Sequence, residues 1–347
     1  MPREAVLYEK LPDHKVRCNL CAHRCGISPG ARGICGVREN QDGTLVSLVY
    51  EKAVACSVDP IEKKPFFHFL PGTRALSIAT VGCNFRCRFC QNYHISDLES
   101  YGGGIEGRRL QCEEVVRLAE AEGCASISYT YTEPTIFFEY AQDCARLAAE
   151  RGIKNNFVTN GYMTEESWRT IAPLLDAANV DLKSMREEFY RSYVGAHLQP
   201  VVDSLRLAKS LGIWIEVTTL VIPGLNDSDE ELEAVASFLA ELGAEVPWHV
   251  SRFHPAHKLV QVGPTPTETL RRARKIGLEA GLRYVYIGNV PGEDGENTFC
   301  PKCGETLIGR VGYRTTEVGL RGSRCAACGT DVDGVGLEGL ASDGRPR

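Results

Sequence analysis

The sequence predicts an α/β protein built on a parallel sheet, either doubly wound or closed towards a barrel. From about residue 75 to residue 290, short apolar segments alternate regularly with amphipathic ones. Hydrophobic residues make up 43% of the chain and charged residues 24%, which is typical of a globular protein. Because 347 residues exceed what one small core needs, we expect a large domain with smaller attachments.

Each element of this alternation follows from its local pattern. In the segment Cys112–Gly123, one helical face holds Val115, Val116, Leu118 and Ala119, and the charged residues lie opposite. The predicted strands are Ala75–Val81, Ser126–Thr130, Asn155–Thr159, Ala178–Leu182, Ile213–Val221, His249–Phe253 and Arg283–Ile287. The predicted helices are Cys112–Gly123, Thr135–Arg151, Thr164–Leu175, Val201–Leu211, Asp229–Leu242 and Pro266–Ala280.

Composition divides the chain into four parts. Residues 1–74 are rich in Cys, Pro and Gly and show no helical periodicity, whereas residues 75–293 carry the α/β pattern. Residues 294–336 hold two Cys pairs separated by a polar stretch that favours a β-hairpin. Residues 337–347 have the composition of a flexible tail. We therefore expect one α/β domain with a small Cys-rich segment at each end.

Charge and hydropathy disfavour two classes of partner. The net charge of −6 is unlike the basic surface of a sequence-independent nucleic-acid binder. The first residues carry charges every few positions and lack the apolar stretch of a signal peptide. No apolar run approaches the roughly 20 residues that a membrane-spanning helix needs. We expect a cytoplasmic protein with neither nucleic acid nor membrane as partner.

The chain contains fifteen cysteines, which is unusual for a protein of a reducing compartment. Clustered cysteines in such a compartment indicate metal sites rather than disulfides. Cys56, Cys112, Cys124 and Cys144 are scattered, and we expect them to pack as small core residues. The other eleven form three groups: Cys18/Cys21/Cys25/Cys35, Cys83/Cys87/Cys90 and Cys300/Cys303/Cys325/Cys328.

The central group follows the first strand of the α/β pattern in the segment ATVGCNFRCRFCQNYHIS. A 4Fe–4S cluster normally takes four cysteines. The three thiolates of Cys83, Cys87 and Cys90 would leave one iron without a protein ligand, where a substrate or cofactor can bind. A zinc site with three Cys ligands is the alternative. The position at the end of a core strand, where barrel enzymes place their chemistry, favours the cluster.

The Cys83-x3-Cys87-x2-Cys90 spacing, with Phe89 before the last Cys, resembles the signature of radical S-adenosylmethionine (SAM) enzymes. The resemblance implies a partial (β/α)6 TIM-like barrel in which the amino and carboxylate groups of SAM chelate the fourth iron. An electron from the reduced cluster then cleaves SAM to methionine and a 5′-deoxyadenosyl radical, which abstracts hydrogen from a substrate. The three cysteines are thus the implied catalytic ligands, and a ferredoxin or flavodoxin the implied electron donor.

The resemblance also implies residues that contact SAM. Glu133, in YTYTEPTIFFEY, lies where the superfamily carries a Gly-Gly-Glu-Pro turn, although Tyr131 and Thr132 replace its two glycines. The segments VTNG and VDLKS look like the Thr-Asn-Gly and Asp-x-Lys turns of glycyl-radical-enzyme activases. Without the resemblance, the Asp and Lys of VDLKS form an ordinary exposed ion pair. The implied SAM contacts are Thr132, Glu133, Thr159, Asn160, Asp181, Lys183, His254 and Asn289.

The two terminal Cys groups predict two further metal sites. Cys18, Cys21, Cys25 and Cys35 lie within eighteen residues, and their spacing suits either zinc or a second Fe–S cluster. Cys300, Cys303, Cys325 and Cys328 form two CxxC pairs, each followed by a glycine that permits a tight turn. A zinc ribbon is the favoured interpretation of the second set, and a rubredoxin-like iron site the alternative.

Over nearly its whole length the chain resembles the radical SAM component of the AmmeMemoRadiSam system, which is related to pyruvate formate-lyase activating enzymes. The segments CNLCAHRC, DPIEKKPFFHFLPG, GCNFRCRFCQN and PWHVSRFHP carry this resemblance together with the terminal Cys pairs. It implies Memo-like and AMMECR-like partners. The alternatives are a glycyl-radical-enzyme activase and, from another class, a non-catalytic electron carrier or scaffold. The substrate and the oligomeric state do not follow from the sequence.

Overall fold

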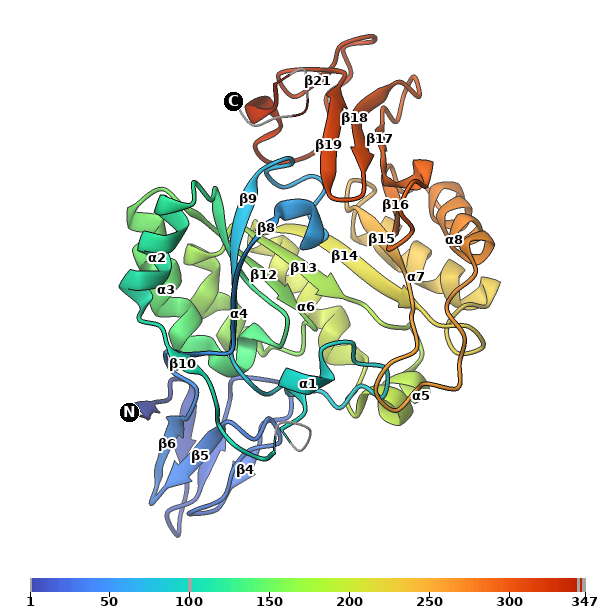
Figure 1. The fold of residues 1–347 in the computed structure, drawn as a ribbon. Helices are drawn as coiled ribbons and strands as arrows, with labels where there is room; N and C mark the ends of the chain where they lie inside the picture. Colours follow the sequence, from blue (N-terminus) through green and yellow to red (C-terminus); the bar gives the residue numbers. More distant parts are fainter. Residues whose placement is uncertain (1, 99–101, 342–343, 345–347) are drawn as a thin grey trace. The chain divides into compact units, whose positions relative to one another are not determined.

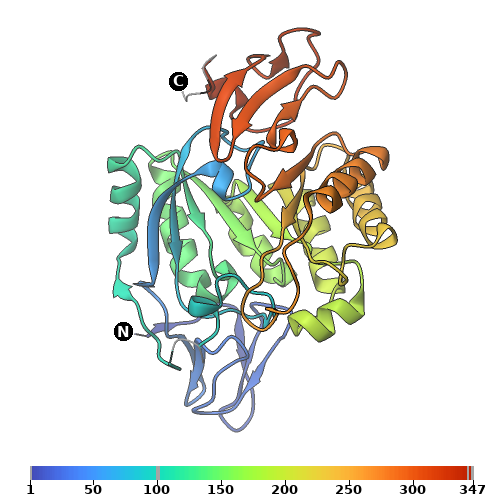
Figure 2. The ribbon, with the colours of Figure 1, turned by 45° about the vertical axis from the view of Figure 1, so that its right-hand side comes forward.

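The computed structural model describes residues 2–98, 102–341 and 344 (Figures 1 and 2). Of the predicted tail, residues 342–343 and 345–347 lie outside the described residues. The chain forms two compact units. The first comprises Met1–Val58, Ala75–Ala178 and Tyr190–Ile213, and the second comprises Asp59–Arg74, Asn179–Phe189 and Trp214–Arg347. Strands β8 (Ala55–Pro60) and β13 (Ala177–Asp181) each run across the division.

Parallel strands flanked by helices form the centre of the first unit. Strand β11 (Ser126–Tyr129) pairs in parallel with β9 (Arg74–Ala79) on one side and β12 (Lys154–Thr159) on the other. Helices α2 (Cys112–Ala121) and α3 (Phe138–Glu150) lie side by side and pack against these strands (Figure 1). The other helical segments of this unit are α1 (Tyr93–Ser96), η2 (Pro134–Phe137), α4 (Glu165–Ile171), η3 (Ala172–Leu174), η4 (Tyr190–Val194, a π-helical turn) and α6 (Gln199–Ser210).

Short antiparallel strands make up the N-terminal part of the first unit. One sheet has the order β1-β6-β5 and another the order β2-β3-β4, while β7 pairs with β10. Several of these strands are only two to four residues long, so turns that carry the Cys residues occupy most of the segment. Their bounds are β1 Arg3–Glu4, β2 Tyr8–Lys10, β3 Val16–Cys18, β4 Gly26–Ile27, β5 Arg38–Gln41, β6 Thr44–Ser47, β7 Lys52–Ala53 and β10 Arg108–Arg109.

The second unit repeats the α/β arrangement. Strand β15 (Trp248–Arg252) pairs in parallel with β14 (Trp214–Val221) and β16 (Val285–Gly288). Helices α7 (Asp229–Leu242) and α8 (Thr267–Glu279) pack on each other, and α8 covers β15 and β16. Helix α7 begins where Ser228 accepts a hydrogen bond from the Glu231 amide, a standard N-terminal cap. The short helical segments are η1 (Ile61–Lys63), α5 (Glu187–Phe189), η5 (Asp294–Glu296) and η6 (Leu337–Gly339).

A small antiparallel module closes the described chain within the second unit. Strand β18 (Thr306–Val311) pairs with β17 (Thr298–Phe299) and β19 (Arg314–Val318), as the red strands of Figure 1 show. Strands β20 (Leu320–Arg321) and β21 (Arg324–Cys325) form a second, shorter hairpin. The apolar core beneath both hairpins includes Cys300, Leu307, Cys325 and Leu337. The hairpin predicted between the Cys pairs is therefore present.

Buried charges join this module to the segment DPIEKKPFFHFLPG of the second unit. Arg310 donates to the Phe67 carbonyl at 2.8 Å, and its guanidinium carbon lies 4.2 Å from the centre of the Phe67 ring. The Nε atom of Arg310 is 3.9 Å from a carboxylate oxygen of Glu62, and neither side chain is exposed. Burial raises the pKa of Glu62 to about 7. The Arg310 charge therefore balances an acidic group that has no access to water.

The prediction of an α/β fold with a parallel sheet is confirmed. Strand β11 is parallel to β9 and β12, and strand β15 is parallel to β14 and β16. Helix α7 has the predicted bounds, and the other predicted elements are shifted by a few residues at their ends. The predicted helix Thr135–Arg151 divides into the 3-10 turn η2 and the α-helix α3. The predicted helix Thr164–Leu175 divides into the α-helix α4 and the 3-10 turn η3. No helix in residues 2–98, 102–341 and 344 is long and apolar enough to cross a membrane.

Candidate functional site: a three-cysteine loop and two terminal cysteine sites

The loop after β9 carries Cys83, Cys87 and Cys90. Gly82 precedes the first cysteine with a φ of 97°, a conformation that favours glycine. The Phe85 amide donates to the Cys83 sulfur at 3.4 Å, and the Cys90 sulfur lies 3.2 Å from the Ser96 hydroxyl. The Cys83 sulfur thus accepts a backbone N–H, and the Cys90 sulfur lies within hydrogen-bond distance of a hydroxyl.

Charge accumulates around the Cys83 sulfur. Burial raises the pKa of the Cys83 thiol well above its ordinary value, and the charges of Glu133, Cys87 and Cys90 raise it further. The Phe85 amide acts in the opposite direction. Thiolates that are this close to other negative groups need a cation to stabilise them. The loop is therefore a candidate metal centre.

The carboxylate of Glu133 holds the neighbouring turns together. It accepts hydrogen bonds from the Thr135 amide at 3.0 Å, the Thr159 hydroxyl at 2.7 Å and the Asn160 amide at 2.8 Å. Only 1% of Glu133 is exposed, and burial raises its pKa, although these donors counteract the shift. Thr132 donates to the Thr80 carbonyl at 2.9 Å, so this turn is also joined to the end of β9.

Asn160 links the turn after β12 to the cysteine loop. Its side-chain amide donates to Asn84 Oδ1 at 2.7 Å and lies 3.9 Å from the Cys83 sulfur. Its side-chain oxygen accepts from the Tyr162 amide at 3.0 Å. Among the predicted residues, the structure thus brings Cys83, Glu133, Thr159 and Asn160 into one hydrogen-bonded group within the first unit.

The other four predicted SAM contacts belong to the second unit. Asp181 and Lys183 form an ion pair at 3.1 Å, with 36% and 12% of their side chains exposed. Asn289, with a φ of 62°, donates to the Ser251 hydroxyl at 2.8 Å, and His254 is exposed. Asp181 ends β13 and Asn289 directly follows β16, so both lie at the carboxyl ends of strands, as the sequence predicts.

The N-terminal cysteines lie together in the first unit. Cys18, Cys21, Cys25 and Cys35 line one small cavity with Arg38. Burial raises the pKa of Cys21, and the charges of the other three thiols add to the increase. Arg38 is buried and pairs with Glu139 at 2.8 Å, and its Nε atom has no hydrogen-bond partner among the described residues. The four cysteines of the sequence-predicted group therefore share a cavity with the guanidinium of a buried ion pair.

The C-terminal cysteines approach one another more closely. The sulfurs of Cys300 and Cys328 are 3.6 Å apart and those of Cys303 and Cys325 are 3.7 Å apart. Gly304 and Gly329 have φ values of 76° and 73°, which confirms the tight turns predicted after each pair. Hydrogen bonds from Thr330 lower the pKa of Cys328 to about 6. In the part of the chain that the structure describes, only this group has all its ligand atoms within 4.8 Å of one another, and it could hold one metal ion.

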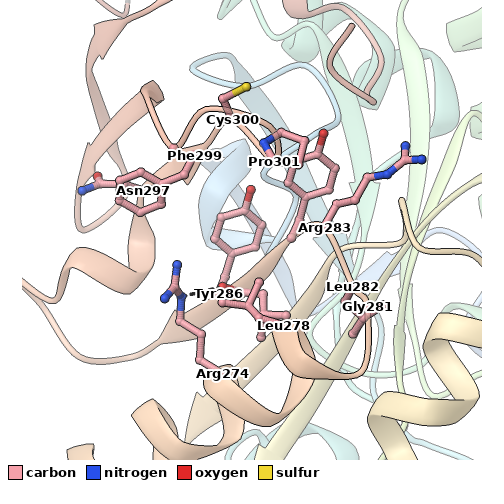
Figure 3. A pocket seen from close by; sticks show the side chains of 13 residues that line it. Arg274, Leu278, Gly281, Leu282, Arg283, Tyr286, Asn297, Phe299, Cys300 and Pro301 are labelled. Atoms are coloured by element: carbon pink, nitrogen blue, oxygen red, sulfur yellow. Dashed lines mark hydrogen bonds between the residues drawn. The ribbon is translucent and has the colours of Figure 1, made fainter. Parts of the chain in front are cut away.

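A pocket of about 470 Å³ adjoins this group in the second unit (Figure 3). Arg274, Tyr286, Phe299 and Cys300 are among its lining residues. Arg274 donates to the Val285 carbonyl at 3.0 Å, so its charge is partly engaged. None of the predicted SAM contacts is among the described residues that line this pocket, which is therefore separate from the predicted site.

Comparisons with known proteins identify the class. Residues 77–239 match the Radical SAM superfamily. The chain is 47% identical over 334 residues to an uncharacterized protein of Methanocaldococcus jannaschii. The match covers 95% of this chain and 99% of that protein. It is 24% identical over 179 residues to the pyruvate formate-lyase-activating enzyme of Clostridium pasteurianum, covering 50% and 71% of the two chains. A radical SAM methyltransferase from Sphaerobacter thermophilus shares its fold, with 20% identity, a TM-score of 0.50 and coverage of 63% and 67%.

The chain belongs to the radical SAM superfamily. Membership implies a 4Fe–4S cluster and SAM. The residues of the loop fit such a cluster, because it offers three thiols within eight residues, and the buried side-chain NH2 of Asn84, the residue after Cys83, has no hydrogen-bond partner among the described residues. A sulfide or thiolate of the cluster would accept that hydrogen bond. Cys83, Cys87 and Cys90 are the residues that would hold the cluster.

Two contributors to the loop escaped the sequence analysis. Asn84 contacts Asn160, and Ser96 contacts Cys90. Both lie within the quoted segment ATVGCNFRCRFCQNYHIS, so their proximity to the cysteines was visible. Their role depends on the direction of the side chains, which the spacing of the cysteines does not give.

We expect Asn160→Asp to impair cluster retention, because a carboxylate would replace an amide donor beside the Cys83 sulfur. Changes to residues that support metal ligands typically lower metal affinity by about 10- to 100-fold. Iron per chain after anaerobic reconstitution, followed by dialysis against a chelator, measures the effect. Asn160→Ala removes the donor without adding charge and should retain more iron than Asn160→Asp. Equal retention by both variants and the unchanged protein would contradict the assignment.

Proposed function

We propose that the chain cleaves SAM reductively and uses the 5′-deoxyadenosyl radical to abstract hydrogen from a substrate. The observation that carries the proposal is the loop after β9, in which the Cys83 sulfur receives hydrogen bonds from the Phe85 amide and the Asn160 side chain, and Asn160 connects Cys83 to Glu133. A 4Fe–4S cluster bound there supplies the electron for cleavage. The non-catalytic alternative, an electron carrier or scaffold, has no need of an α/β core with polar groups at its strand ends.

The proposed roles of the residues follow from their chemistry. Glu133 and Thr159 fix the turns beside the cluster loop through buried hydrogen bonds. Thr132 and Asn160 offer polar groups on the same turns. For the SAM carboxylate and nucleoside we assign four polar groups at the strand ends of the second unit: a carboxylate, an ammonium, an imidazole and a side-chain amide. These are Asp181, Lys183, His254 and Asn289.

We further propose that the chain acts as the radical SAM component of an AmmeMemoRadiSam-type system, in the cytoplasm, with Memo-like and AMMECR-like partners. Support comes from the segments that flank the α/β core, which lie outside the matched superfamily region of residues 77–239. A relative of nearly the same length covers those segments as well. A ferredoxin or flavodoxin is the proposed electron donor.

The second candidate is a glycyl-radical-enzyme activase. Its support is that relatives with 24% and 30% identity are named pyruvate formate-lyase-activating enzyme and isethionate sulfite-lyase activating enzyme. These relatives match 50% and 41% of this chain. Transfer of the radical to a glycine of a partner protein would favour the activase, whereas transfer to a small molecule would favour the first candidate.

For the C-terminal cysteines we propose zinc. A tetrahedral zinc ion with Zn–S bonds of about 2.3 Å places its sulfurs about 3.8 Å apart. The two measured separations, 3.6 and 3.7 Å, are close to this value. Four cysteine ligands leave no position for a substrate, as in structural zinc sites. The ion would therefore stabilise the two hairpins.

Anaerobic reconstitution with iron and sulfide tests the main proposal. With dithionite and SAM, we expect 5′-deoxyadenosine and methionine, measured by liquid chromatography and mass spectrometry. Cys87→Ala should abolish both products, because it removes a cluster ligand. Cys56→Ala, a change at a scattered cysteine, is the matched control and should retain the activity. Absence of SAM cleavage by the reconstituted unchanged protein would refute the proposal.

Metal analysis tests the zinc site. Replacing Cys300, Cys303, Cys325 and Cys328 together by Ser should remove one zinc ion per chain and leave the iron content unchanged. Inductively coupled plasma mass spectrometry of the purified protein gives both counts. Iron in place of zinc in the unchanged protein would show a rubredoxin-like site instead.

A further inference from the structure

The N-terminal cysteine site adjoins the three-cysteine loop, although about fifty residues separate them in the sequence. His23, between Cys21 and Cys25, contacts the Asn84 carbonyl through Nε2 at 2.8 Å. Arg86 donates to the carbonyl of Ile34, the residue before Cys35. Each contact thus joins a neighbour of one cysteine set to a neighbour of the other.

The backbones of the two sites also approach each other at Cys35 and Gly82. A Cβ atom on Gly82 would lie 3.1 Å from the Cys35 carbonyl oxygen and 2.7 Å from a methyl group of Val37. Only glycine fits this position, because its φ of 97° is also in the left-handed region. Since Gly82 directly precedes Cys83, the backbone of one site packs against the backbone of the other.

The spacing of the N-terminal thiols distinguishes between the two metals that the sequence allows. The C-terminal sulfurs lie within 4.8 Å of one another, as a single tetrahedral ion requires. Among the described residues, the four N-terminal sulfurs do not all lie within 4.8 Å of one another. All four N-terminal cysteines nevertheless line one cavity. Thiols that surround a shared space without converging on one point fit a polynuclear cluster better than one zinc ion.

The surroundings of the cavity suit an anionic cluster that exchanges electrons. Arg38 lines the cavity, is 2% exposed, and has an Nε–H without a hydrogen-bond partner among the described residues. Although Arg38 is paired with Glu139, its Nε–H would donate a hydrogen bond to a thiolate or sulfide. Cys21 and Cys25 are only partly buried, so the cavity lies close to the protein surface.

We propose that Cys18, Cys21, Cys25 and Cys35 hold a second iron–sulfur cluster, which relays electrons to the cluster at Cys83, Cys87 and Cys90. In each transfer, a low-potential one-electron carrier protein is oxidised by one electron and the SAM-binding cluster is reduced by one. No bond is formed or broken in the relay, and the second cluster returns to its starting state. The relay role rests on the proposed SAM cleavage, whereas the presence of the second cluster does not.

Metal content tests the second cluster in the full-length chain. Replacing Cys83, Cys87 and Cys90 together by Ala should leave iron and acid-labile sulfide bound, with an electron paramagnetic resonance signal that does not respond to SAM. Cys25→Ala should lower iron and sulfide without changing zinc. Cys303→Ala should lower zinc without changing iron or sulfide. Zinc in place of iron in the triple variant, or loss of zinc from Cys25→Ala, would overturn the proposal.

Kinetics test the relay. In Cys25→Ala, SAM cleavage driven by reduced flavodoxin should fall relative to dithionite-driven cleavage by about tenfold or more, a barrier change of about 1.4 kcal/mol. An unchanged ratio would overturn the relay role. If the unchanged protein fails to cleave SAM with dithionite, the proposed function fails, and the iron count of the triple variant still decides whether the second cluster exists.

Discussion

The buried carboxylate of Glu133 is the constraint on which the arrangement of the site depends. A carboxylate that is only 1% exposed must receive hydrogen bonds, and the structure supplies them from Thr135, Thr159 and Asn160. Thr135 lies in η2, Thr159 ends β12 and Asn160 directly follows β12. Hydrogen bonds to a charged group contribute about 1.5–3 kcal/mol each, so these segments can occupy few other positions. Asn160 extends the same constraint to Asn84 and the cysteine loop.

The sequence predicted the regular elements well, because hydrophobic periodicity is a local property. The charged and apolar residues of Asp229–Leu242 alternate with helical spacing, and α7 has those bounds. The π-helical turn Tyr190–Val194 was not predicted, since its form depends on tertiary packing. The contacts between His23 and Asn84, or between Arg310 and Phe67, join residues far apart in the chain. No local pattern encodes such contacts. The hydrogen bonds that hold the cysteine loop and the C-terminal module against distant segments are therefore seen only in the structure.

The three cysteine groups illustrate what sequence spacing leaves undetermined. The sequence predicts eleven cysteine ligands in three groups, but either terminal set of four could bind zinc or iron. The structure arranges the two terminal sets differently: the paired C-terminal sulfurs lie 3.6–3.7 Å apart, whereas the N-terminal four line a cavity. The central three differ again, because Asn84 and Asn160 place amide groups beside Cys83. One chain thus carries one compact cysteine group and two others, and the backbones of these two approach each other at Cys35 and Gly82.

The most direct measurement of the central claim is electron–nuclear double resonance of the reduced, reconstituted protein with SAM labelled isotopically at its amino nitrogen and carboxylate oxygen. If three cysteines hold the cluster and leave one iron open, both labels should show hyperfine coupling to the cluster spin. A reduced 4Fe–4S signal that shows no coupling to either label, with SAM in excess, would contradict the claim that SAM binds the open iron.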